Sequence, residues 1–361
     1  MDKVTTYSSA GVDTAAGDRA VELMKDAVAK THTANVIGGV GGFAGLVDAS
    51  ALAGMTRPLL ATSTDGVGTK VAVAQAMDVH DTIGQDLVAM VVDDIVTVGA
   101  RPLLMTDYIA CGKVVPEKIA DIVRGIATAC ASISTPLLGG ETAEHPGLLG
   151  EDEYDVAGAA TGVVEADKVL GPERVEGGDV VVAMAASGLH SNGYSLVRHV
   201  LAGAGWDYDR HVEELGRTIG EEILTPTALY TNVCLELAEI AHAFCHVTGG
   251  GLAVNLARVL PRGLLATVER WSVPPIFDIV RCLGNVPVTD LEGTLNLGIG
   301  MLAVLPESRV EEALAVCSRH GINSWVAGHI AADDGGEAVR GGKGAEGGGV
   351  RLIGEYDGLG R

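Results

Sequence analysis

Hydrophobic positions along the chain follow two alternating patterns, one typical of helices and one typical of buried strands. Residues 13–31 carry apolar side chains at helical spacing, and Asp13 or Thr14 can cap the helix. Residues 58–64 (PLLATST) and 101–110 (RPLLMTDYIA) are short apolar runs, which are typical of strands. Because helices and strands alternate, the predicted class is α/β or α+β.

The same patterns predict further elements in both halves of the chain. Helices are expected over 82–99, 116–132, 227–243 and 252–259, with another beginning near Tyr194. Strands are expected over 136–138, 154–165, 179–185, 264–269, 297–305 and 325–330. The polar segment 166–178, with Pro172 and a glycine pair, is the predicted boundary between domains at 1–168 and 176–332.

The last part of the chain, 333–361, is a glycine-rich tail. Residues 333–349 (DDGGEAVRGGKGAEGGG) contain few apolar side chains, so we expect a floppy loop there, followed by a closing strand over 350–354. Gly336–Lys343 resembles a phosphate-binding loop, but Gly344 stands where Ser or Thr is required. We interpret that resemblance as fortuitous.

Composition and charge exclude several classes of protein. The 361 residues are enough for two domains, and 47% are hydrophobic, which predicts a globular chain. The net charge of −22 disfavours binding to nucleic acid or to an anionic membrane surface. No apolar stretch approaches the ~18 residues of a membrane span. The six cysteines form no CxxC pair, so we expect reduced thiols in a cytoplasmic protein.

Two glycine-rich segments of the N-terminal half are candidate nucleotide contacts. Gly39, Gly41 and Gly42 lie in the string GGVGGFAG, which matches a dinucleotide motif but has no convincing strand before it. The segment 64–70 (TDGVGTK) follows a predicted strand, so Asp65 and converging backbone N–H groups suit a phosphate or a phosphate-bound metal. A glycine turn capped by Asp65 explains this segment equally well.

Acidic residues elsewhere in this half are candidate metal ligands. Asp94 lies about 80° from Asp86 around the helix predicted from Thr82 and close to its apolar stripe, where a carboxylate is costly unless paired or metal-bound. For Asp93, a solvated face is the favoured alternative. Glu141 follows paired glycines just past a predicted strand. Asp65, Asp94 and Glu141 are thus a candidate Mg²⁺ set, although their convergence is not visible in the sequence.

The C-terminal half contains two candidate anion sites, each before a predicted helix. The loop 187–193 contains His190 among short hydrogen-bonding residues: Ser187, Ser191 and Asn192. His246 and Thr248 precede three glycines at a helix start. For both segments, a phosphate site and a simple capping turn remain alternatives. In the first segment, His190 is also a candidate proton donor.

Taken together and in this order, these segments resemble the phosphoribosylformylglycinamidine cyclo-ligases, also called aminoimidazole ribonucleotide synthetases. The resemblance covers nearly the whole chain, at residues 7–13, 38–43, 64–70, 80–90, 139–144, 154–158, 187–196, 224–227, 246–251, 258–261 and 298–301. A single match would be weak, but eleven in register are specific. Two departures are Leu297, where the family has cysteine, and the longer tail.

The resemblance implies a two-domain aminoimidazole ribonucleotide synthetase-like fold. It implies a homodimer whose N-terminal sheets pair across the dimer, with an active site in a cleft between the domains. The family uses ATP and Mg²⁺ to phosphorylate the amide oxygen of formylglycinamidine ribonucleotide. Ring closure then gives aminoimidazole ribonucleotide, ADP and phosphate in purine biosynthesis.

The resemblance also assigns roles to the candidate residues. Catalysis is assigned to Asp65, Lys70 and His190, and Mg²⁺ binding to Asp65, Asp94 and Glu141. ATP contacts are assigned to Lys25, Gly39, Gly41, Gly42, Gly68 and Thr69. Substrate contacts are assigned to Ser187, Ser191, Asn192, His246 and Thr248.

Three alternatives remain open. A selenophosphate synthetase would carry a reactive cysteine near its start, whereas the first cysteine here is Cys111. A thiamine-phosphate kinase or a hydrogenase maturation factor is the second alternative, and the kinase tends to have an acid at the position of His246. A non-catalytic acidic scaffold would not need polar residues at so many strand ends.

Overall fold

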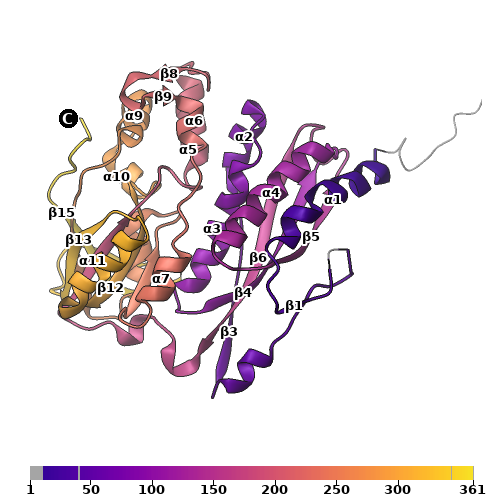
Figure 1. Cartoon of the computed structure of the whole chain (residues 1–361). Helices are drawn as coiled ribbons and strands as arrows, with labels where there is room; N and C mark the ends of the chain where they lie inside the picture. Colours follow the sequence, from indigo (N-terminus) through magenta and orange to yellow (C-terminus); the bar gives the residue numbers. More distant parts are fainter. Residues whose placement is uncertain (1–10, 40, 343, 361) are drawn as a thin grey trace, which may run out of the picture. The chain divides into compact units, whose positions relative to one another are not determined.

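The computed structural model describes residues 11–39, 41–342 and 344–360, which form two compact units. Unit 1 contains the described residues up to Ile95 together with Pro102–Glu165. Unit 2 contains Val96–Arg101 and the described residues from Ala166 onward. Figure 1 colours unit 1 from indigo to magenta and most of unit 2 from pink to yellow. Residues 7–10 of the family match, Val40 of the glycine string and Lys343 lie outside the described residues.

Unit 1 is built on a four-stranded sheet in the order β3-β6-β4-β5. The strands are β3 (Pro58–Gly66), β6 (Tyr154–Glu165), β4 (Arg101–Cys111) and β5 (Leu137–Glu144). β3 and β6 are antiparallel, whereas β4 and β5 are parallel. Alternate residues of β4, such as Met105 and Ile109, are fully buried, as expected for a sheet with one face on the core.

Four helices belong to unit 1: α1 (Thr14–Ala29), α2 (Val71–Met77), α3 (Thr82–Val96) and α4 (Pro116–Ser132). Asp13 caps α1 through its side chain, and Pro116 starts α4 at a position where no backbone N–H is required. α3 and α4 meet at two glycines. A Cβ on Gly84 would lie 2.2 Å from Ile126 N, and one on Gly125 would lie 2.0 Å from Asp81 O. These two glycines therefore allow the backbones of α3 and α4 to pack in direct contact.

Unit 2 is built on a seven-stranded sheet in the order β10-β12-β7-β13-β11-β15-β14. Its strands are β7 (Asp179–Ala185), β10 (Ala243–His246), β11 (Leu264–Glu269), β12 (Ile299–Pro306), β13 (Ser324–Ala332), β14 (Val339–Gly342) and β15 (Ala345–Ile353). β11 and β15 are parallel, and the other neighbours are antiparallel. Six residues of β7 are buried, so this strand forms the centre of the core.

The remaining elements are short. Unit 2 contains helices α5 (Tyr194–Gly203), α6 (Ile219–Ile223), α7 (Thr231–Leu237), α8 (Gly251–Arg258), α9 (Pro275–Gly284), α10 (Val288–Glu292) and α11 (Val310–Arg319). Small hairpins pair β1 (Val36–Ile37) with β2 (Leu46–Val47) and β8 (His211–Val212) with β9 (Arg217–Thr218). Turns of 3₁₀ helix occur at Ser50–Gly54, Gly68–Lys70, Ala166–Lys168, Pro172–Arg174, Glu213–Leu215 and Glu307–Arg309. Among the described helices, none has the length and apolar content needed to cross a bilayer.

Most predicted elements are confirmed, and four need correction. The helix predicted over 227–243 is wrong at both ends, because α7 covers only Thr231–Leu237 and the short buried strand β10 begins at Ala243. A short apolar run carries no periodicity that separates helix from strand. α3 ends at Val96 instead of residue 99. β5 continues through the glycine pair to Glu144, so Glu141 lies within the strand and not beyond its end.

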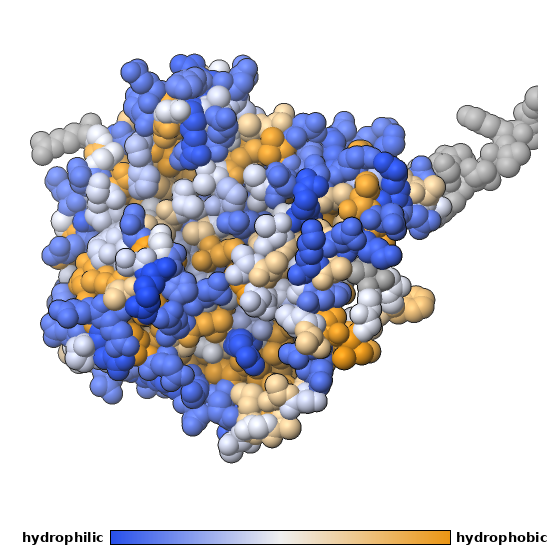
Figure 2. Space-filling view, viewed as in Figure 1, coloured by the Kyte–Doolittle hydropathy of each residue, from blue (hydrophilic) through white to orange (hydrophobic). Residues whose placement is uncertain are grey.

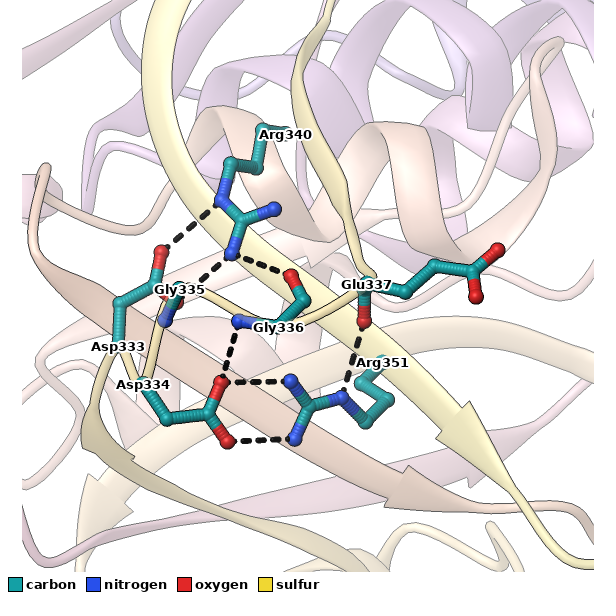
Figure 3. A network of polar contacts seen from close by, with 7 residues as sticks. All are labelled: Asp333, Asp334, Gly335, Gly336, Glu337, Arg340 and Arg351. Atoms are coloured by element: carbon teal, nitrogen blue, oxygen red, sulfur yellow. Dashed lines mark hydrogen bonds and ion pairs between the residues drawn. The ribbon is translucent and has the colours of Figure 1, made fainter.

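The predicted floppy loop over 333–349 is wrong, because β14 covers Val339–Gly342 and β15 begins at Ala345 within this segment. Two ion pairs hold it, as Figure 3 shows: Arg340 Nε and Nη2 donate to Asp333, and Arg351 Nη1 and Nη2 donate to Asp334. Paired contacts between a guanidinium and a carboxylate restrict the side chains on both sides. The polar residues that suggested disorder are therefore the ones that order the tail.

The glycines of the tail are required by close packing. A Cβ on Gly347 would lie 1.8 Å from Ala257 O at the end of α8, and one on Gly348 would lie 2.6 Å from Leu264 O. No other residue fits at such distances without moving the backbone. The low-complexity sequence thus reflects the closeness of β15 to its neighbours.

Candidate functional site

A cavity of about 700 Å³ lies within unit 1. Its walls come from α1, the described part of the glycine segment, α4 and strands β4 and β5. Gly39, Gly41 and Gly42 line it, as do Gly139 and Gly140. This volume falls within the range of small-molecule sites, roughly 300–1,000 Å³. The structure therefore places the first predicted glycine segment at a cavity large enough for a ligand.

The glycine segment connects the antiparallel strands β1 and β2. The next helical turn, Ser50–Gly54, is a 3₁₀ helix that follows β2. A dinucleotide-binding motif needs a strand before the glycines and an α-helix directly after them. The structure therefore does not support a dinucleotide-binding motif at these glycines.

Asp107 is a cavity residue that the sequence interpretation missed. It lies on β4 at the spacing of Met105 and Ile109, so it points to the covered face of the sheet, and it is 9% exposed. Burial raises the pKa of Asp107 to about 7. An acid at an apolar position of a strand was the available signal in the sequence.

The three predicted Mg²⁺ ligands do not form one site within the described chain. Asp65 lies on β3 and Glu141 on β5, at opposite edges of the sheet, three strand spacings or about 14 Å apart. Within residues 11–39, 41–342 and 344–360, no three His, Cys, Asp or Glu side chains are grouped to hold a metal. The predicted convergence of these three acids is therefore wrong for a single chain.

The acids of α3 differ from expectation in their exposure. Asp93 is fully buried, so the favoured solvated face is wrong for it, and Asp94 is exposed. The exposed carboxylate of Asp94 is accessible to a ligand. Asp65 is half-buried, and its Oδ1 accepts a hydrogen bond from Gly66 N at 2.7 Å, a contact expected of the predicted turn-capping alternative.

Lys70 is buried and does not reach solvent. Its Nζ donates to Asp86 Oδ1 at 2.9 Å, and both side chains are 0% exposed. Desolvation lowers the pKa of Lys70, and the negative charge of Asp86 partly offsets this. The predicted phosphate contact of Lys70 is therefore not available in this structure, because the ammonium is enclosed with a carboxylate.

The other predicted ATP contacts are exposed. Lys25 lies on the solvent side of α1, and Gly68 and Thr69 lie in the 3₁₀ turn that follows β3. None of these three residues lines the cavity. Gly68 has a φ of +72°, so the turn needs a glycine there.

In unit 2, the structure brings the two predicted anion segments together. Gly249 N, in the turn before α8, donates to Asn192 Oδ1 at 3.0 Å. Ser191 Oγ lies 3.3 Å from Thr227 Oγ1, and Ser187 Oγ donates to Pro226 O at 2.6 Å. Two glycine-rich turns and their hydroxyl groups therefore share one region of the unit.

His190 lies inside this region and is 1% exposed. Its Nε2 accepts a hydrogen bond from Ser187 N at 3.1 Å, so that nitrogen carries no proton and the ring is neutral. The residue has a φ of +60°, and Gly300 leaves room for its ring, since a Cβ there would lie 2.4 Å from His190 Cε1. This geometry is that of a loop-positioning residue, so the predicted role as proton donor lacks a free Nε2 proton here.

His246 and Thr248 frame the second turn. His246 is the last residue of β10 and is 6% exposed, whereas Thr248 is half-buried and its carbonyl accepts from Asn255 Nδ2 at 3.1 Å. Gly250 and Gly251 follow with φ of +104° and +72°. These glycines let the backbone turn directly into α8.

Comparisons with known proteins identify the family. Residues 47–164 match the model of the AIR synthase related protein N-terminal domain, and residues 176–341 match that of the C-terminal domain. The phosphoribosylformylglycinamidine cyclo-ligase of Shouchella clausii is 46% identical, covering 94% of this chain and 99% of the relative. That of Carboxydothermus hydrogenoformans is 44% identical over 91% and 97%. The chain belongs to the phosphoribosylformylglycinamidine cyclo-ligase family.

Membership confirms the predicted family and makes the chain a ligase with a role in purine biosynthesis. Solved structures agree on the fold. The thiamine-monophosphate kinase of Stenotrophomonas maltophilia has a TM-score of 0.64 at 18% identity, covering 92% of this chain and 96% of that one. The hydrogenase maturation protein HypE in complex with ATP has a TM-score of 0.62 at 17% identity, covering 93% and 91%. The predicted fold class is confirmed.

Proposed function

We propose that this family member closes the imidazole ring of aminoimidazole ribonucleotide at the expense of ATP. The cavity of unit 1 would take the nucleoside part of ATP, and the paired turns of unit 2 would take the phosphate of formylglycinamidine ribonucleotide. The observation that carries the proposal is the identity of 46% over nearly the full length of a cyclo-ligase. A fold neighbour solved with ATP agrees with the choice of nucleotide.

The reaction requires the protein mainly to position two anionic groups. An amide oxygen is a poor leaving group and becomes a good one once phosphorylated, after which the amidine nitrogen can attack the same carbon. Backbone N–H groups at the start of α8 and the hydroxyl groups of Ser187, Ser191 and Thr248 are suited to a phosphate. Asn192 fixes one turn to the other.

Mg²⁺ fits as a phosphate-bound ion and not as a centre held by three acids of one chain. Mg²⁺ in such sites is held by one or two carboxylates together with substrate phosphates. When bound, it neutralises charge on the transferred phosphoryl group. Asp94 is exposed and Glu141 lines the cavity, which supports a role for each as the source of a single carboxylate, with Asp65 as a further candidate at the opposite edge.

We also propose a homodimer formed through the open face of the unit 1 sheet. Alternate residues on that face remain accessible in the single chain, including Leu60 at 67% and Tyr108 at 41% exposure. Figure 2 shows hydrophobic residues at the surface over the lower part of β3. Face-to-face packing of two such sheets would bury them. A dimer by sedimentation supports this, and a monomer at micromolar concentration contradicts it.

A cytoplasmic location remains part of the proposal. Five of the six cysteines are buried free thiols and Cys282 is an exposed one, which suits a reducing compartment. Fractionation of cells and detection of the chain in the soluble cytoplasmic fraction would test the location directly.

The direct test measures ligand binding and turnover on the purified chain. MgATP should raise the melting temperature, and formylglycinamidine ribonucleotide should raise it further, because both ligands bind the folded state. Aminoimidazole ribonucleotide should form only with both present. Stabilisation by MgATP together with no turnover of this substrate would support another activity of the superfamily.

The substrate loop gives a second test. Replacing His190 by alanine should raise KM for formylglycinamidine ribonucleotide about tenfold, because the acceptor for Ser187 N is lost and the loop loosens. His190→Gln, which can provide an acceptor, should lose less, and KM for ATP should change little. Steady-state kinetics check this. A lower melting temperature with unchanged KM would leave His190 with a structural role alone.

A further inference from the structure

The cavity of unit 1 has an unusual balance of charge for a nucleotide site. Its lining residues are mainly glycine and apolar side chains, among them Ala20, Met24, Val28 and Leu137. Among the described lining residues, the two ionisable ones, Asp107 and Glu141, are both acids. A phosphate would be repelled there, whereas a planar, uncharged ring with hydrogen-bonding edges would fit.

Asp107 is an acidic residue that lines this cavity from the covered face of the sheet. Within the described part of the chain, its carboxyl has no hydrogen bond or ion pair with another side chain, and its own backbone N–H is the group that stabilises its charge. Gly140 on the neighbouring strand leaves space for it, because a Cβ there would lie 2.3 Å from Asp107 Oδ1 and 2.7 Å from Oδ2. Because Asp107 lines the cavity, its carboxyl group is available for a hydrogen bond to a ligand.

Glu141 does not share this position. In the parallel pair of β4 and β5, Glu141 is the partner of Tyr108 and Gly140 is the partner of Asp107. Glu141 therefore lies on the open face with exposed Tyr108, on the other side of the sheet from Asp107. The two acids do not form a pair of metal ligands, which leaves Asp107 for hydrogen bonding.

We propose that Asp107 recognises the adenine base of ATP, with its carboxyl O–H donating to N1 and its carbonyl oxygen accepting from the N6 amino group. This inference rests on the proposed use of ATP and adds the residue that recognises its base. A neutral carboxyl group presents a donor and an acceptor side by side, as adenine does on that edge. A charged carboxylate presents acceptors only and would face the N1 lone pair.

The protonation state follows from the surroundings of Asp107. Desolvation holds its pKa at about 7, so a large fraction of the carboxyl groups carries a proton near neutral pH. The other titratable groups near it are Cys130 on α4, whose pKa burial raises, and Glu141 on β5. α1 and the described part of the glycine segment contribute no titratable side chain to the lining.

The test measures the dissociation constant of ATP across pH for the full-length chain. For the wild type, binding should weaken as the pH rises from about 6 to about 8.5, approaching tenfold per pH unit above the pKa, because only the protonated carboxyl binds. Asp107→Asn should bind ATP at least as well at the upper pH and should lose this dependence, since an amide keeps both donor and acceptor. Asp107→Leu should bind about 10- to 100-fold more weakly.

Controls separate this inference from the proposed function. Asp121→Asn changes an acid of α4 that pairs with Arg124 at the surface, and it should keep the wild-type pH profile. If the wild type binds no ATP, the proposed function fails. If the wild type binds ATP and Asp107→Asn keeps the same pH profile, or raises only the Mg²⁺ concentration required, then Asp107 does not read the base and the inference is overturned.

Discussion

Replacing Lys70 by methionine should lower the free energy of unfolding by about 3–5 kcal/mol, the largest loss of stability we expect from one substitution. The reason is the enclosed pair with Asp86, in which both side chains are 0% exposed. Without the ammonium, the carboxylate of Asp86 stays buried with one favourable charge interaction removed. Chemical denaturation at neutral pH measures the change.

Two further variants make this result specific. Lys118→Met removes an ammonium from a partly exposed pair with Asp78, and should cost less than about 1 kcal/mol. The double variant Lys70→Met, Asp86→Leu should recover most of the lost stability, since it removes both charges. Equal losses of unfolding free energy for the single variants at Lys70 and Lys118 would show that the buried pair contributes no more to stability than the surface pair.

The largest effect on turnover should come from Asp94→Asn, with kcat reduced about 100-fold or more. Asp94 is exposed on α3, so the loss of its charge should weaken binding of the phosphate-bound Mg²⁺ without disturbing the fold. The melting temperature should therefore stay within the experimental error of the wild type. Kinetics at saturating ATP and substrate, repeated at raised Mg²⁺, measure the effect.

Asp121→Asn is again the matched surface control and should keep wild-type kcat. Normal turnover of a folded Asp94→Asn chain would remove Asp94 from the metal site. In that case Glu141, which lines the cavity, becomes the first acid to test.

The fold was predictable where local signals agree. Helix α4 begins at Pro116 and ends at Ser132 as predicted, because proline, helical periodicity and a following turn coincide. Strand β10 was not predictable, because its three apolar residues, Ala243, Phe244 and Cys245, show no alternation and fit a helix end equally well. The ordered tail was missed because its stability depends on contacts between Asp334 and Arg351, which are far apart in sequence.

The candidate site was predictable in residue types and less so in geometry. The glycine segment and the loop with Asn192 lie at a cavity and at a paired turn, as their composition suggested. The distance between Asp65 and Glu141 depends on strand order, which no local pattern encodes. Likewise, the exposure of Asp94 and the burial of Asp93 depend on how α3 packs against α4 at Gly84 and Gly125.

The strand order of unit 2 has a consequence for synthesis on the ribosome. β7 is the first strand of its sheet to emerge, yet its neighbours β12 and β13 begin only at Ile299 and Ser324. Until then the apolar residues of β7 have no strand beside them, and the nascent chain exposes an aggregation-prone segment. The central strand pairing of unit 2 can therefore be completed only after the ribosome has passed β13, near the end of the chain.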